Sequence, residues 1–263
     1  MNIKYLLGSI LSLPLLPLLY FQGQRIRANV PELPEAIEPQ GIAGELGKTK
    51  LNLLCLGEST IAGVGVKYHG EGFAGTLAAE LANSQDAEIH WRVYAKSGYT
   101  AKQVKQKLVP ELREEKPDLI VIGLGGNDAF TLNRPWKWRQ QMEQLIDALQ
   151  EQFKDIPIFL TNVPPIKEFP AFTKPIKFVI GNLVEILGQE LTKITKQKHL
   201  VHYNAEIITI KSWTKKWKVD GNVNDFFSDG VHPSKLTYQV WAKDMAQFID
   251  KKLADSRVFR KQL

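Results

Sequence analysis

Short apolar runs alternate along the chain with longer stretches in which apolar residues recur at helical spacing. The apolar runs, which predict five strands, cover 50–56, 89–95, 119–124, 158–162 and 199–203. The helical stretches cover 72–82, 101–115 with a break near Pro110, 137–153, 178–197 and about 234–254. Strands that alternate with helices are typical of a parallel sheet covered on both faces, so the sequence predicts an α/β fold.

Distinctive residues follow the first three predicted strands at the point where each strand ends. Ser59 comes after the first strand, Gly98 after the second and Asn127 after the third. Ligands of such sheets bind beyond the carboxyl ends of the strands. We therefore expect these three residues to lie at one edge of the sheet.

A fourth motif, Asp229-Gly230-Val231-His232-Pro233, lies near the end of the chain. A serine hydroxyl is a weak nucleophile that needs a histidine to accept its proton and a carboxylate to orient that histidine. Ser59, His232 and Asp229 fit these three roles. Each motif alone has a structural explanation, as a helix cap, a turn or a helix start, but their joint occurrence favours catalysis.

With these motifs the chain resembles the SGNH hydrolases, also called the GDSL esterase/lipase family, of a bacterial membrane-anchored type. The matching blocks are Leu53 to Thr60, Ala95 to Thr100, Gly125 to Asp128 and Asp229 to Pro233, in the family's order. Glu58 departs from the family pattern, which usually has Asp before the serine. The resemblance implies a three-layer α/β/α sandwich with a five-stranded parallel sheet of the flavodoxin-like type.

The resemblance also implies a mechanism. Ser59 would attack an ester carbonyl, with His232 as acid and base and Asp229 holding the imidazole. The oxyanion hole would consist of the backbone N–H groups of Ser59 and Gly98 and the side-chain amide of Asn127. The expected protein is a serine esterase acting on lipid-like or small acyl esters, without cofactor or metal. Two alternatives stay open: an O-acyltransferase or thioesterase with the same site, and a non-catalytic binding module tethered to a membrane.

Candidate substrate contacts lie in two loops near the same sheet edge. The apolar, proline-rich loop over 163–175 carries Phe169 and Phe172, and the loop over 131–138 carries Trp136. These aromatic side chains could line an acyl pocket. Packing of the loops onto the domain is an equally good interpretation, because aromatic residues often serve packing.

The N-terminal region differs in kind from the rest of the chain. An uncharged apolar stretch over 5–21 follows Lys4 and precedes Arg25 and Arg27, without a small-residue cleavage site close behind it. This layout favours an uncleaved signal anchor over 1–27, followed by a tether over 28–49 and the hydrolase domain over 50–263. We expect a single anchor in the inner membrane, in preference to secretion, with the domain on the periplasmic or cytoplasmic side.

The net charge and the cysteine content indicate which binding partners and cross-links the chain can have. The formal net charge of +6 suits weak attraction to anionic membrane surfaces, and no nucleic-acid fold accompanies it. The basic stretch over 211–218 could contact anionic lipid or be a solvated face. A single cysteine, Cys55, excludes an intramolecular disulfide. The expected partners are therefore an ester substrate and the membrane.

Overall fold

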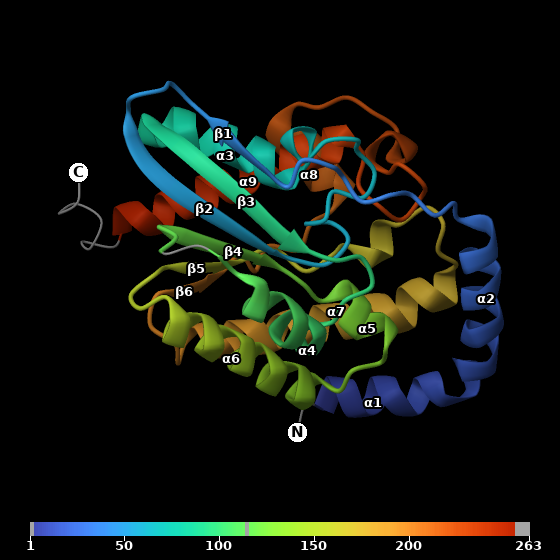
Figure 1. Ribbon diagram of the computed structural model, residues 1–263. Coiled ribbons are helices and arrows are strands. Elements are labelled where there is room, and N and C mark those ends of the chain that lie inside the picture. Colours follow the sequence, from blue (N-terminus) through green and yellow to red (C-terminus); the bar gives the residue numbers. More distant parts are fainter. Residues whose placement is uncertain (1–2, 114–115, 256–263) are drawn as a thin grey trace.

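The computed structural model describes residues 3–113 and 116–255, and in this part of the chain six strands form one sheet (Figure 1). The strands are β1 Gln40–Ala43, β2 Thr49–Gly57, β3 Ala87–Ala95, β4 Leu119–Gly123, β5 Ile158–Leu160 and β6 Val201–Tyr203. Their spatial order is β1-β3-β2-β4-β5-β6, in which β2 to β6 pair in parallel and β1 pairs antiparallel with β3.

The five parallel strands and their order confirm the flavodoxin-like prediction, because β3-β2-β4-β5-β6 corresponds to the strand order 2-1-3-4-5. The sheet also has a strand beyond the five predicted, since β1 adds an antiparallel edge strand. β1 lies within 28–49, the stretch predicted to be a tether. It escaped detection because it has four residues, none of them buried. Gly41 of β1 packs so closely on the indole of Trp91 that a Cβ there would be 2.6 Å from the ring.

Helices cover both faces of the sheet, which confirms the three layers (Figure 1). One face carries α4 Ala101–Gln103, α6 Pro135–Gln152 and α7 Lys174–Thr195, and the other carries α3 Phe73–Gln85, α8 Ile210–Trp217 and α9 Lys235–Asp255. The short α5 Gly126–Phe130 follows β4 directly. Side chains of β2 alternate between the two apolar clusters, with Leu54 in one and Cys55 in the other.

The helix predicted over 101–115 is divided into three short pieces. After α4 come a π-helical turn, Val104–Leu108, and a 3₁₀ turn, Val109–Glu111, which contains Pro110. The expected break at Pro110 is thus confirmed, because proline cannot supply the N–H that a continuous helix requires. The predicted end of this helix, Glu115, lies outside the described residues.

The three central strands end at the same level of the sheet. Gly57 at the end of β2 lies beside Ala95 of β3 and beside Gly123 of β4. A Cβ on Gly57 would lie 2.4 Å from the Gly123 carbonyl oxygen and 2.4 Å from a carbon of Ile61. Only glycine therefore allows the chain to turn over the strand end here. The segments that follow these strands consequently emerge side by side.

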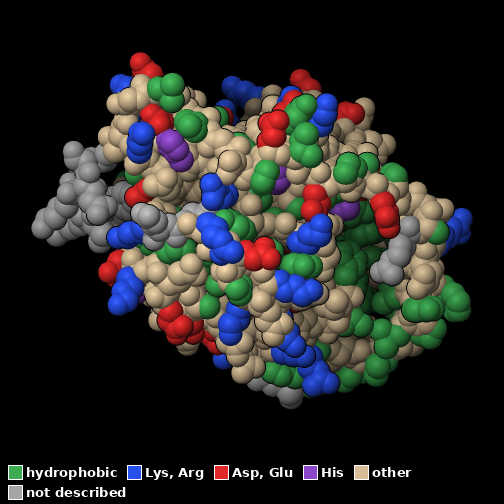
Figure 2. All heavy atoms as spheres, in the orientation of Figure 1, with side chains coloured by type: hydrophobic (Ala, Val, Ile, Leu, Met, Phe, Trp, Pro, Cys, Tyr) green, Lys and Arg blue, Asp and Glu red, His purple; other side chains and the backbone are tan. Residues whose placement is uncertain are grey.

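The N-terminal region forms two helices outside the sheet layers, α1 Ile3–Ser12 and α2 Leu16–Asn29, joined by a 3₁₀ turn, Leu13–Leu15. Pro14 lies within this turn and Pro17 in the first turn of α2, and the two helices run in clearly different directions (Figure 1). Their apolar side chains are largely exposed along one edge of the molecule (Figure 2). Among the described residues, Ile3–Ile26 is long and apolar enough to span a membrane, and signal sequences share this property.

Candidate active site

Ser59 lies in a tight turn directly after β2. The turn is closed by N–H groups of Ile61 and Ala62, which donate to the Glu58 carbonyl oxygen at 2.9 and 2.8 Å. The N–H of Val64 donates to the Ser59 carbonyl oxygen at 3.1 Å. The Ser59 side chain is half-buried, and the next α-helix begins only at Phe73, so Ser59 does not cap a helix.

Gly98 lies in a four-residue turn after β3. The N–H of Tyr99 donates to the Lys96 carbonyl oxygen at 3.2 Å, and Gly98 has φ of 83° in the third position. This is the arrangement of a type II turn, whose third position favours glycine. The Lys96 N–H donates to the Gly57 carbonyl oxygen at 3.2 Å, which ties the turn to the end of β2. In the described residues the Gly98 N–H has no protein acceptor, and a Cβ at this position would have no atom within 4 Å.

Asn127 stands in the first turn of α5, and its side chain is held by the neighbouring turn. Its Nδ2 donates to the Tyr99 carbonyl oxygen at 3.1 Å. The next residue, Asp128, is fully buried and accepts from the Ala101 N–H and from the Asn133 side chain, each at 2.9 Å. Asp128 therefore braces the loops rather than facing a substrate.

Glu58 connects the serine turn to Asn127. Its carboxylate oxygens accept from the backbone N–H groups of Gly126 and Asn127, both at 2.8 Å, and the residue is 3% exposed. The residue that departs from the family pattern thus has its hydrogen-bond acceptors occupied. Its carboxylate fixes the backbone from which the Asn127 side chain projects.

Burial raises the pKa of Glu58 to about 7, although the N–H groups of Asn127 and Gly126 favour the anion. The folded protein therefore binds this proton more tightly than the unfolded chain, whose group has a pKa near 4.5. The tighter proton binding therefore adds to the free energy of unfolding, with its full effect below about pH 4.5. This contribution is lost as the pH rises through about 7, and it amounts to about 3 kcal/mol at most.

We expect the stability of the wild type relative to Glu58→Gln to fall across this interval. The variant lacks the titrating group, so other carboxylates cancel in the comparison. Denaturant unfolding of both proteins at several pH values measures the difference. A difference that stays constant with pH would contradict this assignment.

Asp229 and His232 form a pair on one loop. The Asp229 Oδ2 lies 2.7 Å from His232 Nδ1, while Oδ1 accepts from the backbone N–H groups of Val231 at 2.8 Å and His232 at 2.7 Å. Burial opposes ionisation of Asp229, but the bonds from His232 outweigh it and hold the pKa of Asp229 below its usual value. An ionised carboxylate requires a proton on Nδ1, which leaves Nε2 free to accept one.

The loop with His232 contacts the serine turn directly. The Ser228 hydroxyl donates to the Gly65 carbonyl oxygen at 3.1 Å, and the Tyr238 hydroxyl donates to the Val64 carbonyl oxygen at 2.7 Å. Both acceptors belong to the turn that begins at Glu58. Segments far apart in sequence are thereby joined at the carboxyl edge of the sheet.

The aromatic residues predicted to contact substrate have different surroundings. Phe169 and Phe172 are buried, and their ring centres lie 5.3 Å apart. The Ala171 N–H between them donates to the Gly230 carbonyl oxygen at 3.1 Å, so this loop supports the loop of His232. Trp136 is 52% exposed and packs edge-on against Tyr5 of α1.

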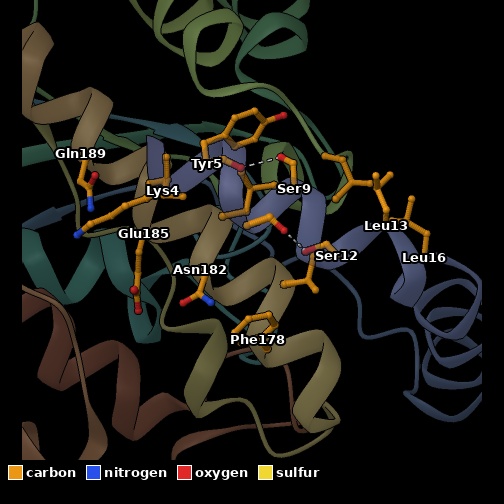
Figure 3. Close-up of a pocket in the computed structure, with 15 residues that line it drawn as sticks. Lys4, Tyr5, Ser9, Ser12, Leu13, Leu16, Phe178, Asn182, Glu185 and Gln189 are labelled. Atoms are coloured by element: carbon orange, nitrogen blue, oxygen red, sulfur yellow. Dashed lines mark hydrogen bonds between the residues drawn. The ribbon is translucent and has the colours of Figure 1, made fainter. Parts of the chain in front are cut away.

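Several hollows lie near these elements, and two of them are candidate substrate sites. A small, mainly apolar cavity of about 50 Å³ lies behind the serine turn, where Glu58, Thr60 and Phe169 line it. A groove of about 430 Å³ lies between α1 and α7, where Tyr5, Leu13, Phe178 and Asn182 line it (Figure 3). Neither Ser59, Asn127 nor His232 lines this groove, which is therefore separate from the candidate site.

A family model described as "GDSL-like Lipase/Acylhydrolase family" matches residues 55–240, and the chain belongs to this family. The matched region extends from β2 into α9 and includes Ser59, Gly98, Asn127 and His232. A search of curated proteins finds no match. The fold and the family together place the chain in a class of hydrolases.

Several solved structures are similar in fold. TesA matches with 20% identity and a TM-score of 0.56, over 74% of this chain and 95% of TesA. A family 3 carbohydrate esterase of Clostridium thermocellum matches with 16% identity and a TM-score of 0.54, over 76% of this chain and 99% of the esterase. A member of the lipolytic G-D-S-L family from Veillonella parvula matches with 13% identity and a TM-score of 0.54, over 75% of this chain and 97% of that protein.

Proposed function

We propose that the protein is a serine esterase that hydrolyses carboxylic esters. Ser59 Oγ attacks the ester carbonyl while His232 Nε2 accepts its proton and later delivers it to the leaving alcohol. Asp229 holds the imidazole in the required tautomer. The observation that carries the proposal is the 2.7 Å contact between His232 Nδ1 and a buried Asp229 carboxylate, on a loop bonded to the serine turn.

Three donors for the tetrahedral oxyanion complete the proposed mechanism. They are the backbone N–H groups of Ser59 and Gly98 and the side-chain amide of Asn127. The contacts among the three turns support this role, because prearranged donors need no reorganisation as charge develops. Tyr99 orients the Asn127 amide through its carbonyl oxygen, and Glu58 fixes the backbone beneath it.

The proposal is tested by hydrolysis of p-nitrophenyl esters of increasing acyl length by the full chain in detergent. Ser59→Ala, prepared identically, defines the background. Turnover that depends on Ser59 supports an esterase, and the preferred length reports the size of the acyl site near Phe169, Phe172 and Trp136. Wild-type rates equal to those of Ser59→Ala across the series would refute ester hydrolysis.

Asn127→Ala should lower kcat by roughly 100-fold or more, with a smaller change in KM, if the amide stabilises the oxyanion. The effect falls on kcat because the amide is needed most when the carbonyl oxygen becomes charged. Asn133→Ala is the matched control, since Asn133 also bonds within this region, to Asp128, without belonging to the proposed site. Equal kcat values for the wild type and Asn127→Ala would show that the Asn127 amide does not stabilise the oxyanion.

We also propose that the segment over 1–27 attaches the protein to the inner membrane, with the hydrolase domain on its periplasmic or cytoplasmic side. The length, apolar composition and exposure of Ile3–Ile26 support this. Alkaline extraction of membranes tests it: an anchored chain stays with the membrane pellet, and release into the supernatant would contradict anchoring.

A further inference from the structure

A carboxylate from outside the four family motifs contacts the turn that carries Gly98. Glu35 Oε1 accepts from the Ser97 backbone N–H at 2.6 Å, and Oε2 accepts from Lys96 Nζ at 2.9 Å. Glu35 belongs to the extended segment between α2 and β1, some sixty positions before its partners in the sequence. The N-terminal segment thus reaches the carboxyl edge of the sheet.

The same segment also contacts the serine turn. The Ala36 N–H donates to the Ala62 carbonyl oxygen at 2.9 Å, and the Ile37 N–H donates to the Lys67 carbonyl oxygen at 3.0 Å. A Cβ on Gly63 would lie 2.6 Å from the Ala36 methyl group, so the two backbones are closely packed. Glu35 is consequently held by its neighbours at a fixed place beside both turns.

The Gly98 turn has few restraints of its own. Glycine adds no side chain that could limit rotation, and the turn lies exposed at the sheet edge. In the described residues, its backbone is held by the Lys96 N–H bond to Gly57, the Tyr99 N–H bond to Lys96, the Asn127 amide bond to the Tyr99 carbonyl oxygen and the Ser97 N–H bond to Glu35. The Glu35 bond holds the peptide plane between Lys96 and Ser97. The next peptide plane along the chain carries the Gly98 N–H.

We infer that Glu35 is a positioning residue, which aims the Gly98 N–H at the substrate oxyanion by accepting the Ser97 N–H. The inference rests on the proposed function, because the direction of this N–H matters to turnover only if Gly98 stabilises the oxyanion. On this inference, the segment between α2 and β1 helps to orient an oxyanion donor of the proposed site.

The acceptor oxygen of Glu35, rather than its charge, performs this role. The Lys96 side chain is 53% exposed, and an ion pair of that kind is screened by water and contributes little. A glutamine at position 35 retains an oxygen that can accept the Ser97 N–H, whereas an alanine does not. The two substitutions therefore separate the contribution of the hydrogen bond from that of the charge.

The test compares four variants of the full chain in detergent: Glu35→Ala, Glu35→Gln, Lys96→Met and the control Glu32→Ala. Glu32 is exposed and lies on the same segment. Steady-state kinetics with the best p-nitrophenyl ester give kcat and KM. Hydrogen exchange followed by mass spectrometry reports on the amides over 96–99, and a melting curve reports on the fold.

Glu35→Ala should lower kcat about tenfold, a fraction of the loss expected for removing an oxyanion donor, with KM within about twofold. Exchange over 96–99 should become faster in this variant, while Glu35→Gln, Lys96→Met and Glu32→Ala remain close to the wild type. Unchanged kcat and exchange in Glu35→Ala would overturn the inference, as would an equal loss in Glu35→Gln.

Failure of the proposed function gives a different result. Wild-type turnover equal to that of Ser59→Ala would refute the esterase, and the inference, which rests on it, would fall as well. If turnover depends on Ser59 but Glu35→Ala matches the control in kcat, the esterase stands and the role of Glu35 is refuted.

Discussion

Replacing Ser59 by alanine should reduce ester turnover by roughly a thousandfold or more, the largest effect expected for this chain. In the proposed mechanism, the substitution removes the oxygen that would form the covalent intermediate. The fold should persist, because the serine turn is closed by backbone bonds from Ile61, Ala62 and Val64. Initial rates with a p-nitrophenyl ester, beside a melting curve by circular dichroism, measure both outcomes.

Ser84→Ala serves as the matched control for this experiment. Ser84 is an exposed serine on α3, and its hydroxyl bonds to Leu81 and Asp250 away from the candidate site. Its removal should leave the rate unchanged. Retention of most of the activity by Ser59→Ala, together with a normal melting curve, would exclude Ser59 as the nucleophile.

The second large effect concerns Asp229→Asn, which should lower kcat by about a thousandfold or more with KM little changed. The new amide can keep the two backbone bonds through its oxygen but presents an NH₂ group to His232 Nδ1. That nitrogen must then accept, so the proton moves to Nε2, where it would block the proposed removal of the Ser59 proton. A pH profile of kcat and a melting curve separate this effect from unfolding.

Asp225→Asn provides the comparison on the neighbouring turn. Asp225 is exposed, and its carboxylate accepts from the Asn222 N–H, a bond that an asparagine oxygen can retain. We expect wild-type kcat for this variant. An Asp229→Asn protein with kcat within a few-fold of Asp225→Asn would show that the carboxylate does not orient the histidine.

Much of the sheet was predictable because its central strands are buried on both faces. β4 is apolar throughout and β2 is apolar over 53–56, and such runs in an alternating chain indicate parallel strands. Helix starts were less accurate. α6 begins at Pro135 and α7 at Lys174, before the predicted starts at 137 and 178, because the predicted loops include Pro135 and Pro175. Proline in the first turn is compatible with a helix, since that N–H has no helical partner.

The candidate site was predictable only as far as its motifs extend. Ser59, Gly98 and Asn127 follow strands whose ends coincide, so a sequence pattern could place them at one edge. The bond from Gly126 to Glu58 joins residues 68 positions apart and leaves no periodic signal. Glu35 is similar, since it lies in a stretch without periodicity. A domain beginning at residue 50, the predicted boundary, would lack both Glu35 and β1.

The two edge strands of the sheet determine how readily this protein can aggregate with other chains. β1 has four residues at one edge and β6 has three at the other, while the longest strands, β2 and β3, lie inside. Exposed strand edges present unpaired backbone groups on which a foreign strand can add. Here those edges are too short to offer much of a template. The sheet can therefore keep strongly apolar central strands without inviting edge-to-edge aggregation.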